Sequence, residues 1–373
     1  YLEVYFKFRV RKFMKLFKSL LVAPATLGLL APMSATANEV TINDFNAAEE
    51  IAVTNSRVDG LEARLNNFEA GSFSETTVAS FSVDSVLGSI DGDAASEKTT
   101  FDYQFNIGLS TSFTGEDSLD IAIDSGITSL SPMGTVMGFD SGTGLKVDGV
   151  TYTFPLGGAT VVVGDSTDIS ATFTGACAYS AFTDATPDDC GTGNSLGVGG
   201  PSSRVAASIG YTFDSGFSLA GGLASPQTEI VGDAQDVYGV EAAYNADGYG
   251  VALAYVSDDG GTSAETTYWG LNGYYSFDLA SLSVGFETSD DGTTESDGYF
   301  VGLSFPEVGP GSVNIAAATT GLFADSATET LVYEASYSYA LNDGMTITPG
   351  IFIQEVDGAD DQTGVAVKTS FSF

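Results

Sequence analysis

The chain has 373 residues, of which 43% are hydrophobic and 12% aromatic, and its 49 acidic and 12 basic side chains give a formal net charge of −37. Charge repulsion opposes partners such as nucleic acid or an anionic lipid surface, and the hydrophobic and aromatic content argues against a disordered acidic chain. The absence of histidine removes Ser-His-Asp and Cys-His nucleophiles and most transition-metal sites. We therefore expect no enzyme activity, no cofactor and no metal.

Residues 1–37 resemble a secretory signal peptide with an upstream extension. Met14 begins a positively charged segment, residues 20–31 are apolar, and Ala35-Thr-Ala37 places small residues at a signal-peptidase site. Removal of this segment leaves six basic and 48 acidic residues, a net charge near −42. Since no later segment approaches the ~20 apolar residues of a membrane helix, a mature chain that enters a membrane must do so as a β-barrel.

Residues 38–76 are predicted to form a periplasmic segment with a helix over about 48–69. Apolar residues repeat there with the a/d spacing of a coiled coil, and the seam consists of Ile51, Val58, Leu61, Leu65 and Phe68. A helix of this length is marginal on its own. It either joins identical chains or packs as a single amphipathic helix on its own domain.

From residue 77 to residue 373, segments of about ten residues alternate apolar and polar side chains. The clearest of these segments begin at Phe101, Val205, Trp269 and Leu331, and their length suits a tilted strand that crosses a bilayer. Tight turns such as Phe213-Asp-Ser-Gly alternate with longer acidic loops. This pattern predicts an all-β transmembrane fold, an antiparallel up-and-down β-barrel of about 16 strands. A count of 14 is the alternative, because residues 113–165 are rich in glycine and difficult to divide.

The last segment, residues 363–373, is predicted to be the strand that closes the barrel. Its apolar face consists of Val365, Val367, Phe371 and Phe373, and its other face is small or polar. A barrel strand with lipid outside and water inside has this pattern. An edge strand of a soluble sandwich has it too, so two stacked sheets are the competing interpretation.

Residues 165–203 form a segment of about 39 residues, too long for a simple connection. It contains Cys177 and Cys190, which in a secreted protein predict a disulfide. A long loop of this kind can fold into a wide barrel and narrow the pore. The alternative is an external loop that the disulfide protects against proteolysis.

Alternation also places charged side chains on the lumen side of the predicted barrel. These pore-lining residues are Asp102, Arg204, Glu241, Glu287, Glu334 and Lys368. Charged rings set ion preference in aqueous pores, so the excess of carboxylates would favour cations. The alternative is that these charges only solvate a wet wall.

Three regions together resemble the cyanobacterial outer-membrane porins related to the carbohydrate-selective, OprB-like porin family. They are the signal segment from Met14, the segment Arg57-Val-Asp-Gly-Leu-Glu-Ala-Arg64 with Glu69–Thr77 after it, and the terminal strand Val365–Phe373. Family members usually carry an S-layer-homology domain before the coiled coil. Only about 13 residues separate Ala37 from Ile51 here, so cell-wall anchoring is not carried over.

The resemblance implies an outer-membrane location in a Gram-negative type of envelope and passive diffusion of ions and small hydrophilic solutes. It further implies a homotrimer, with outer-membrane lipid and the barrel-assembly machinery as partners. The family name also implies carbohydrate transport, although the sequence has no identifiable ladder of aromatic and basic residues for sugars. The alternative function is a plugged barrel with a structural or adhesive role in the cell envelope.

Overall fold

The computed structural model describes residues 77–92, 98–165, 167–186, 190, 204–230, 235–261 and 264–373. The chain divides into two compact units, Tyr1–Gly71 and Ser72–Phe373, and every described residue belongs to the second. The predicted signal segment and coiled-coil helix, with the seam from Ile51 to Phe68, therefore lie outside the described residues.

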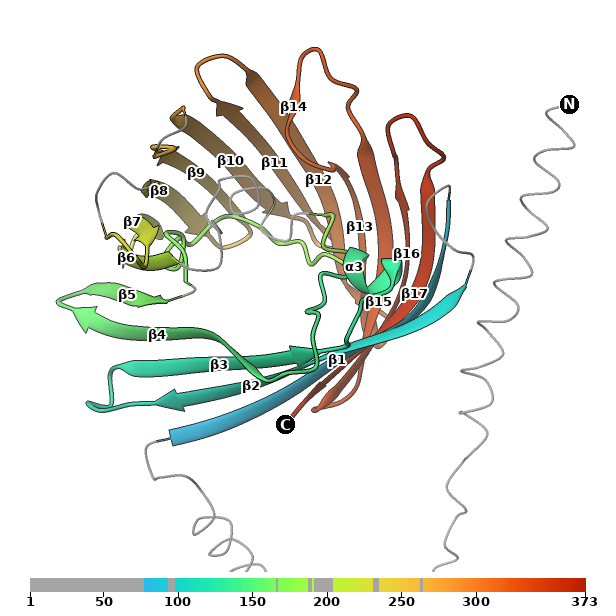
Figure 1. Ribbon diagram of the computed structural model, residues 1–373, viewed down its shortest axis with the longest axis horizontal. Helices are drawn as coiled ribbons and strands as arrows, with labels where there is room; N and C mark the ends of the chain where they lie inside the picture. Colours follow the sequence, from blue (N-terminus) through green and yellow to red (C-terminus); the bar gives the residue numbers. More distant parts are fainter. Residues whose placement is uncertain are drawn as a thin grey trace, which may run out of the picture. The chain divides into compact units, whose positions relative to one another are not determined.

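Sixteen antiparallel strands of the described part close into a barrel (Figure 1). The strands are β1 (Thr77–Asp91), β2 (Thr99–Thr111), β3 (Ser118–Gly126), β4 (Lys146–Leu156), β5 (Ala159–Asp165), β6 (Arg204–Thr212), β7 (Phe217–Pro226), β8 (Val237–Ala246), β9 (Tyr249–Asp258), β10 (Thr266–Ser276), β11 (Ser281–Asp290), β12 (Glu295–Val308), β13 (Gly311–Thr319), β15 (Leu331–Asn342), β16 (Met345–Gln354) and β17 (Gln362–Ser372). The two-residue strand β14 (Phe323–Ala324) pairs with β12 beside this ring, so β13 pairs directly with β15. A short helix, α3 (Pro132–Val136), follows β3.

Along the strands, successive side chains point alternately to the outside and the inside of the barrel, as the sequence pattern predicts. On β2, Phe101 and Tyr103 are 56% and 40% exposed, whereas Asp102 between them is 1% exposed. Trp269 and Leu271 on β10 are likewise about half exposed on the outer face. Apolar side chains outside and polar or small ones inside are the pattern of a transmembrane barrel. No helix among the described residues is long and apolar enough to cross a membrane.

Connections differ between the two ends of the barrel. At one end, which we call the short-turn end, the connections are short: residues 157–158 are among the shortest, and residues 112–117 form the longest. At the other, the long-loop end, they include residues 127–145 and 166–203. Gly216 and Gly248 occupy short turns with φ of +86° and +83°, a conformation that favours glycine.

Strand β17 closes the barrel by pairing with β1, from Ser82 opposite Ser372 to Asp91 opposite Thr363. Phe81 and Phe373 exchange backbone hydrogen bonds of 2.9 and 3.0 Å, and their rings stack at 5.8 Å. The predicted barrel of 16 strands is confirmed, and the soluble sandwich is excluded by the closed ring.

Candidate functional site

The long connection between β5 and β6 runs inside the barrel. We call its described part, residues 167–186 and 190, the inward loop. Figure 1 shows it inside the ring of strands, where it runs from the β6 side toward α3. Its residues contact one wall strand after another in chain order, so the loop lies along the wall instead of hanging free in the lumen.

The first contact of the inward loop is apolar. Ile169 is fully buried in a cluster of wall side chains, which are Ala206, Ala224, Val237, Ala254 and Val256. A Cβ on Gly222 of β7 would lie against the carbonyl oxygen of Ile169 and 2.9 Å from its Cα. A glycine at this strand position therefore allows the loop backbone to approach the wall.

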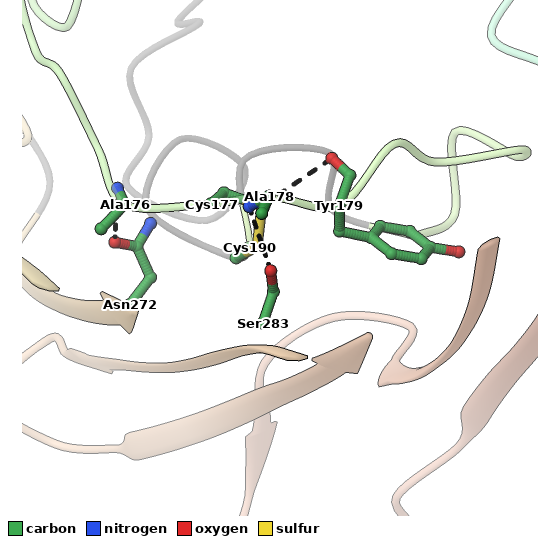
Figure 2. Close-up of a disulfide and its surroundings, with 7 residues drawn as sticks. All are labelled: Ala176, Cys177, Ala178, Tyr179, Cys190, Asn272 and Ser283. Carbon is green, nitrogen blue, oxygen red and sulfur yellow. Dashed lines mark hydrogen bonds between the residues drawn. A yellow bond between two sulfur atoms is a disulfide. The ribbon is translucent and has the colours of Figure 1, made fainter. Parts of the chain in front are cut away.

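Beyond Ile169, alternate backbone amides of the loop donate to wall side chains. The amides belong to Thr174, Ala176 and Ala178, and their acceptors are, in that order, Glu241 Oε1 at 2.7 Å, Asn272 Oδ1 at 3.0 Å and Ser283 Oγ at 3.0 Å. Figure 2 shows the last two of these bonds. Alternate residues of an extended chain point to the same side, so the wall satisfies these amides much as a neighbouring strand would.

Glu334 on β15 is the second carboxylate that holds the loop. Its Oε1 accepts from Tyr179 Oη at 2.6 Å and from the amide of Phe182 at 2.8 Å. Its Oε2 accepts from the amide and hydroxyl of Thr183 at 3.0 and 2.7 Å. Burial, together with the neighbouring Glu334 carboxylate, raises the pKa of Tyr179 well above its ordinary value.

The predicted disulfide joins Cys177 and Cys190, whose Cα atoms are 5.6 Å apart. Cys190 is fully buried in a cluster of Tyr179, Phe300 and three small wall residues, Ala316, Ala318 and Val332. The disulfide therefore links a loop residue between two amide anchors to a second point on the wall (Figure 2).

A second loop, residues 127–145, also turns inward and contains α3. Ser131 caps this helix, and its amide donates to Asp102 Oδ1 at 2.9 Å while its hydroxyl donates to Oδ2. Met133 lies in an apolar cluster with Val86, Ile90, Met137, Phe139, Phe182, Phe352 and Ala366. The amide of Asp184 donates to the carbonyl of Val136 at 2.9 Å, which joins this loop to the inward loop.

The six predicted pore-lining charges all lie on strand positions that face inward, but loops cover most of them. Asp102, Glu241 and Glu334 bind the loops, as described above. Arg204 and Glu287 are 4% and 6% exposed. Lys368 is half-buried, with its Nζ 6.0 Å from the centroid of the Phe139 ring.

Other charged residues remain accessible on the inner faces of β1 to β4 and on the adjoining loop 127–145, which together we call the open wall. Asp120 and Asp124 on β3 are half-buried, and Asp140 and Lys146 are exposed. Asp124 lies opposite Lys146 in the pairing of β3 with β4 and interacts electrostatically with both Asp140 and Lys146. The amide of Asp140 donates to Gln104 Oε1 at 3.0 Å. On β1, Asp84 accepts from the hydroxyl of Ser370.

A model of the Gram-negative porin family matches residues 67–360. The chain belongs to this family. It is 27% identical to the uncharacterized protein alr4550 of Nostoc sp., over an alignment that covers 95% of the chain and 75% of that protein. The predicted resemblance to outer-membrane porins is thus confirmed.

Solved structures that share the fold of this porin include the following two. OprB of Pseudomonas putida has a TM-score of 0.64 at 14% identity, over 80% of this chain and 94% of that one. An engineered variant of the Rh. blastica porin has a TM-score of 0.55 at 16% identity, over 80% of this chain and all of that one.

Sequence reasoning missed the accessible carboxylates of the porin. Asp84, Asp120 and Asp124 follow the same alternation that identified Asp102, with apolar Leu119 and Ile121 on either side of Asp120. The signal was present, but for Asp120 and Asp124 the glycine-rich segment 113–165 hid the strand boundaries. Asp140 lies in a loop that carries no alternation, so only the structure identifies it.

Proposed function

We propose that this porin is an open channel through which ions and small hydrophilic solutes diffuse passively, and that it prefers cations. The observation that carries this proposal is the course of the inward loop, which lies along the wall and turns its amides toward that wall. The described part of the loop therefore lies beside the wall, and the open wall faces the lumen with hydroxyl, amide and carboxyl groups. Such a lining suits hydrated solutes.

The cation preference rests on the open wall and not on the carboxylates that hold the loops. A carboxylate buried under a loop has its oxygens occupied by protein donors and contributes little to the field that a passing ion meets. The accessible charges are Asp84, Asp120, Asp124 and Asp140, against Lys146 and Lys368. This excess of negative charge attracts cations and repels anions.

We place the channel in the outer membrane, with the short-turn end in the periplasm and the long loops outside. Outer-membrane barrels have short periplasmic turns and longer external loops. Aromatic pairs near the strand ends support two membrane interfaces. Near the short-turn end these are Tyr211 with Phe213 and Tyr275 with Phe277, and toward the long-loop end Tyr255 with Trp269.

The test is conductance in a planar lipid bilayer. Purified protein is expected to give discrete current steps, and the reversal potential in a potassium chloride gradient is expected to have the sign of cation preference. A barrel that gives no steps is plugged, which would support the structural or adhesive alternative. A reversal potential of the opposite sign would exclude the cation preference alone. Liposome swelling with neutral sugars of graded size tests the carbohydrate transport that the family resemblance implies.

The homotrimer is a separate proposal. Chemical crosslinking in detergent is expected to yield trimers, and the Leu61→Pro and Leu65→Pro variants test whether the predicted coiled coil holds the subunits together. Unchanged crosslinking of both variants would assign subunit contacts to the barrel instead.

A further inference from the structure

We propose that the Cys177–Cys190 disulfide is a redox-sensitive latch, which keeps the Tyr179–Glu334 anchor on the wall and so keeps the lumen clear. Reduction of the disulfide would let residues 179–183 of the inward loop move into the lumen and obstruct the current. The effect on current rests on the proposed channel function. The effect on Tyr179 does not.

The first argument concerns Cys177. Its neighbours Ala176 and Ala178 donate their amides to Asn272 and Ser283 on β10 and β11 (Figure 2). These bonds fix Cys177 on the wall whether or not the disulfide exists. Cys177 is therefore the fixed half of the latch.

The second argument concerns Cys190, the held half. Its φ is +59°, a left-handed conformation that persists in a non-glycine residue only where surrounding contacts enforce it. Its carbonyl lies so close to Gly285 of β11 that a Cβ there would collide with it. Full burial and an enforced backbone conformation indicate that Cys190 is pressed onto the wall, and the disulfide supplies a covalent tie for that position.

The third argument connects Cys190 to the anchor. Cys190 shares its cluster with Tyr179 and Phe300, whose ring centroids are 5.1 Å apart. The Tyr179 hydroxyl donates to Glu334 inside this cover. If Cys190 leaves, lumen water reaches the ring and the carboxylate, and a hydrogen bond that is strong when shielded must compete with water.

The direction of movement follows from the position of the loop. Residues 176–178 stay on the wall through their amide bonds. The wall strands lie on one side of residues 179–183, so this segment, once released, can move only toward the lumen. We therefore expect reduction to lower and destabilise the current instead of raising it.

The chemistry is a thiol–disulfide exchange with a dithiol such as dithiothreitol. Cys177 is half-buried and Cys190 fully buried, so the thiolate attacks Cys177 Sγ. A bond forms between the reagent sulfur and Cys177 Sγ, the bond between Cys177 and Cys190 breaks, and Cys190 leaves as a thiolate that takes up a proton. The second thiol of the reagent then displaces Cys177, so the dithiol is oxidised to a cyclic disulfide and the protein gains two electrons and two protons.

The experiment adds dithiothreitol to the folded porin in a bilayer, so that folding itself is not affected. We expect the steady current of each channel to become lower and flickering, and to recover after reoxidation. The Cys177→Ser/Cys190→Ser double variant is expected to show the reduced behaviour without reagent and to be insensitive to it. Alkylation of the two thiols confirms that reduction has occurred.

A second measurement reports the latch without current. The pH titration of tyrosinate absorbance is measured for the oxidised porin and for its Tyr179→Phe variant, and the difference reports Tyr179 alone. This difference is expected to stay near zero as the pH passes the ordinary pKa of tyrosine, about 10, because burial and Glu334 raise the pKa of Tyr179. In the double serine background the same difference is expected to appear at lower pH, closer to that ordinary value.

The outcomes separate the two proposals. An oxidised porin that never conducts contradicts the channel, and the Tyr179 titration then decides on the latch alone. A conducting porin whose current is unchanged or larger after proven reduction overturns the latch. So does a Tyr179 titration that is the same with and without the disulfide.

Discussion

Carboxylates on two parts of the inner wall all point into the barrel from their strands, but their surroundings differ. On the loop-covered wall, Glu241 and Glu334 are each 3% exposed and accept hydrogen bonds from the inward loop. On the open wall, Asp120 and Asp124 remain half-buried and reach the lumen. Strand alternation places all four inside the barrel, so it is the loop that decides which of them can meet a solute.

The difference has a physical cause. A buried carboxylate is tolerated only where donors replace the water it loses. A loop backbone that lies against a wall has unpaired amides with the same requirement. Glu241 and Glu334 meet both requirements at once, which makes them positioning residues for the loop. Asp120 and Asp124 are only half-buried, so they stay in contact with the lumen and keep their influence on ions.

The largest expected effect comes from Glu334→Gln. The amide group would turn an N–H₂ toward donors that now face an oxygen, leaving buried groups unsatisfied at a cost of roughly 3 kcal/mol. We expect faster protease cleavage within the inward loop and a lower free energy of unfolding in urea. Glu307→Gln, the same change at an exposed position of β12, is the matched control. Equal behaviour of the two variants would show that Glu334 does not hold the loop.

A second test changes two neighbouring glycines of β7. Alanine at Gly222 would place its Cβ 2.9 Å from the Cα of Ile169, so the loop must shift, at roughly 1–3 kcal/mol for an overpacked position. Alanine at Gly221 meets its nearest atoms at 3.4 and 3.6 Å, an ordinary contact, and should change stability by less than about 0.5 kcal/mol. Urea unfolding of both variants measures the difference. If Gly222→Ala is as stable as Gly221→Ala, the loop does not lie against β7 at this point.

Much of the fold could be predicted because alternation and turn chemistry are local. The apolar faces that include Trp269 and Val240, and the turn at Phe213–Gly216, are readable from a few residues each. The segment from 113 to 165 was harder for a physical reason. A register shift interrupts the pairing of β3 with β4 between Ala122 and Ile123, and the loop with α3 separates the two strands.

The interior was less predictable because burial there depends on distant contacts. Alternation correctly identified Glu334 as inward, yet its partners Tyr179 and Thr183 lie about 150 residues earlier in the chain. Nothing within β15 reveals that a loop from between β5 and β6 will cover it. The cysteine pair and the length of that loop were the only local signs that it would have a role in the lumen.

A third prediction tests the open wall directly. In water a unit charge attracts a cation ~7 Å away by about 0.6 kcal/mol and repels an anion by the same amount. Two carboxylates, screened by roughly half at 0.1 M salt, therefore change the cation-to-anion preference by about 1.2 kcal/mol, so the double variant Asp120→Asn/Asp124→Asn should lower the permeability ratio roughly eightfold. The reversal potential in a salt gradient should move toward zero, and less so at high ionic strength. Asp247→Asn/Asp343→Asn removes the same charge from exposed short turns and should leave the ratio nearly unchanged. A larger shift from this control would place the selectivity at the mouth of the barrel instead of its wall.

The smallest effect is expected at the short-turn end, where Asp117 organises the turn between β2 and β3. The hydrogen bond from Tyr152 Oη at 2.6 Å, with those from Thr114 and Ser112, outweighs burial and holds the pKa of Asp117 well below its ordinary value. Because the folded-state pKa is lowered, the ionised Asp117 carboxylate stabilises the folded protein. This contribution is complete above the ordinary pKa of about 4 and is lost as the pH falls toward the folded-state value. The melting temperature of the wild type should therefore exceed that of Asp117→Asn at pH 7, and the gap should narrow below about pH 4. A gap that stays constant from pH 7 to pH 3 would mean that the turn depends on the shape of the side chain and not on its charge.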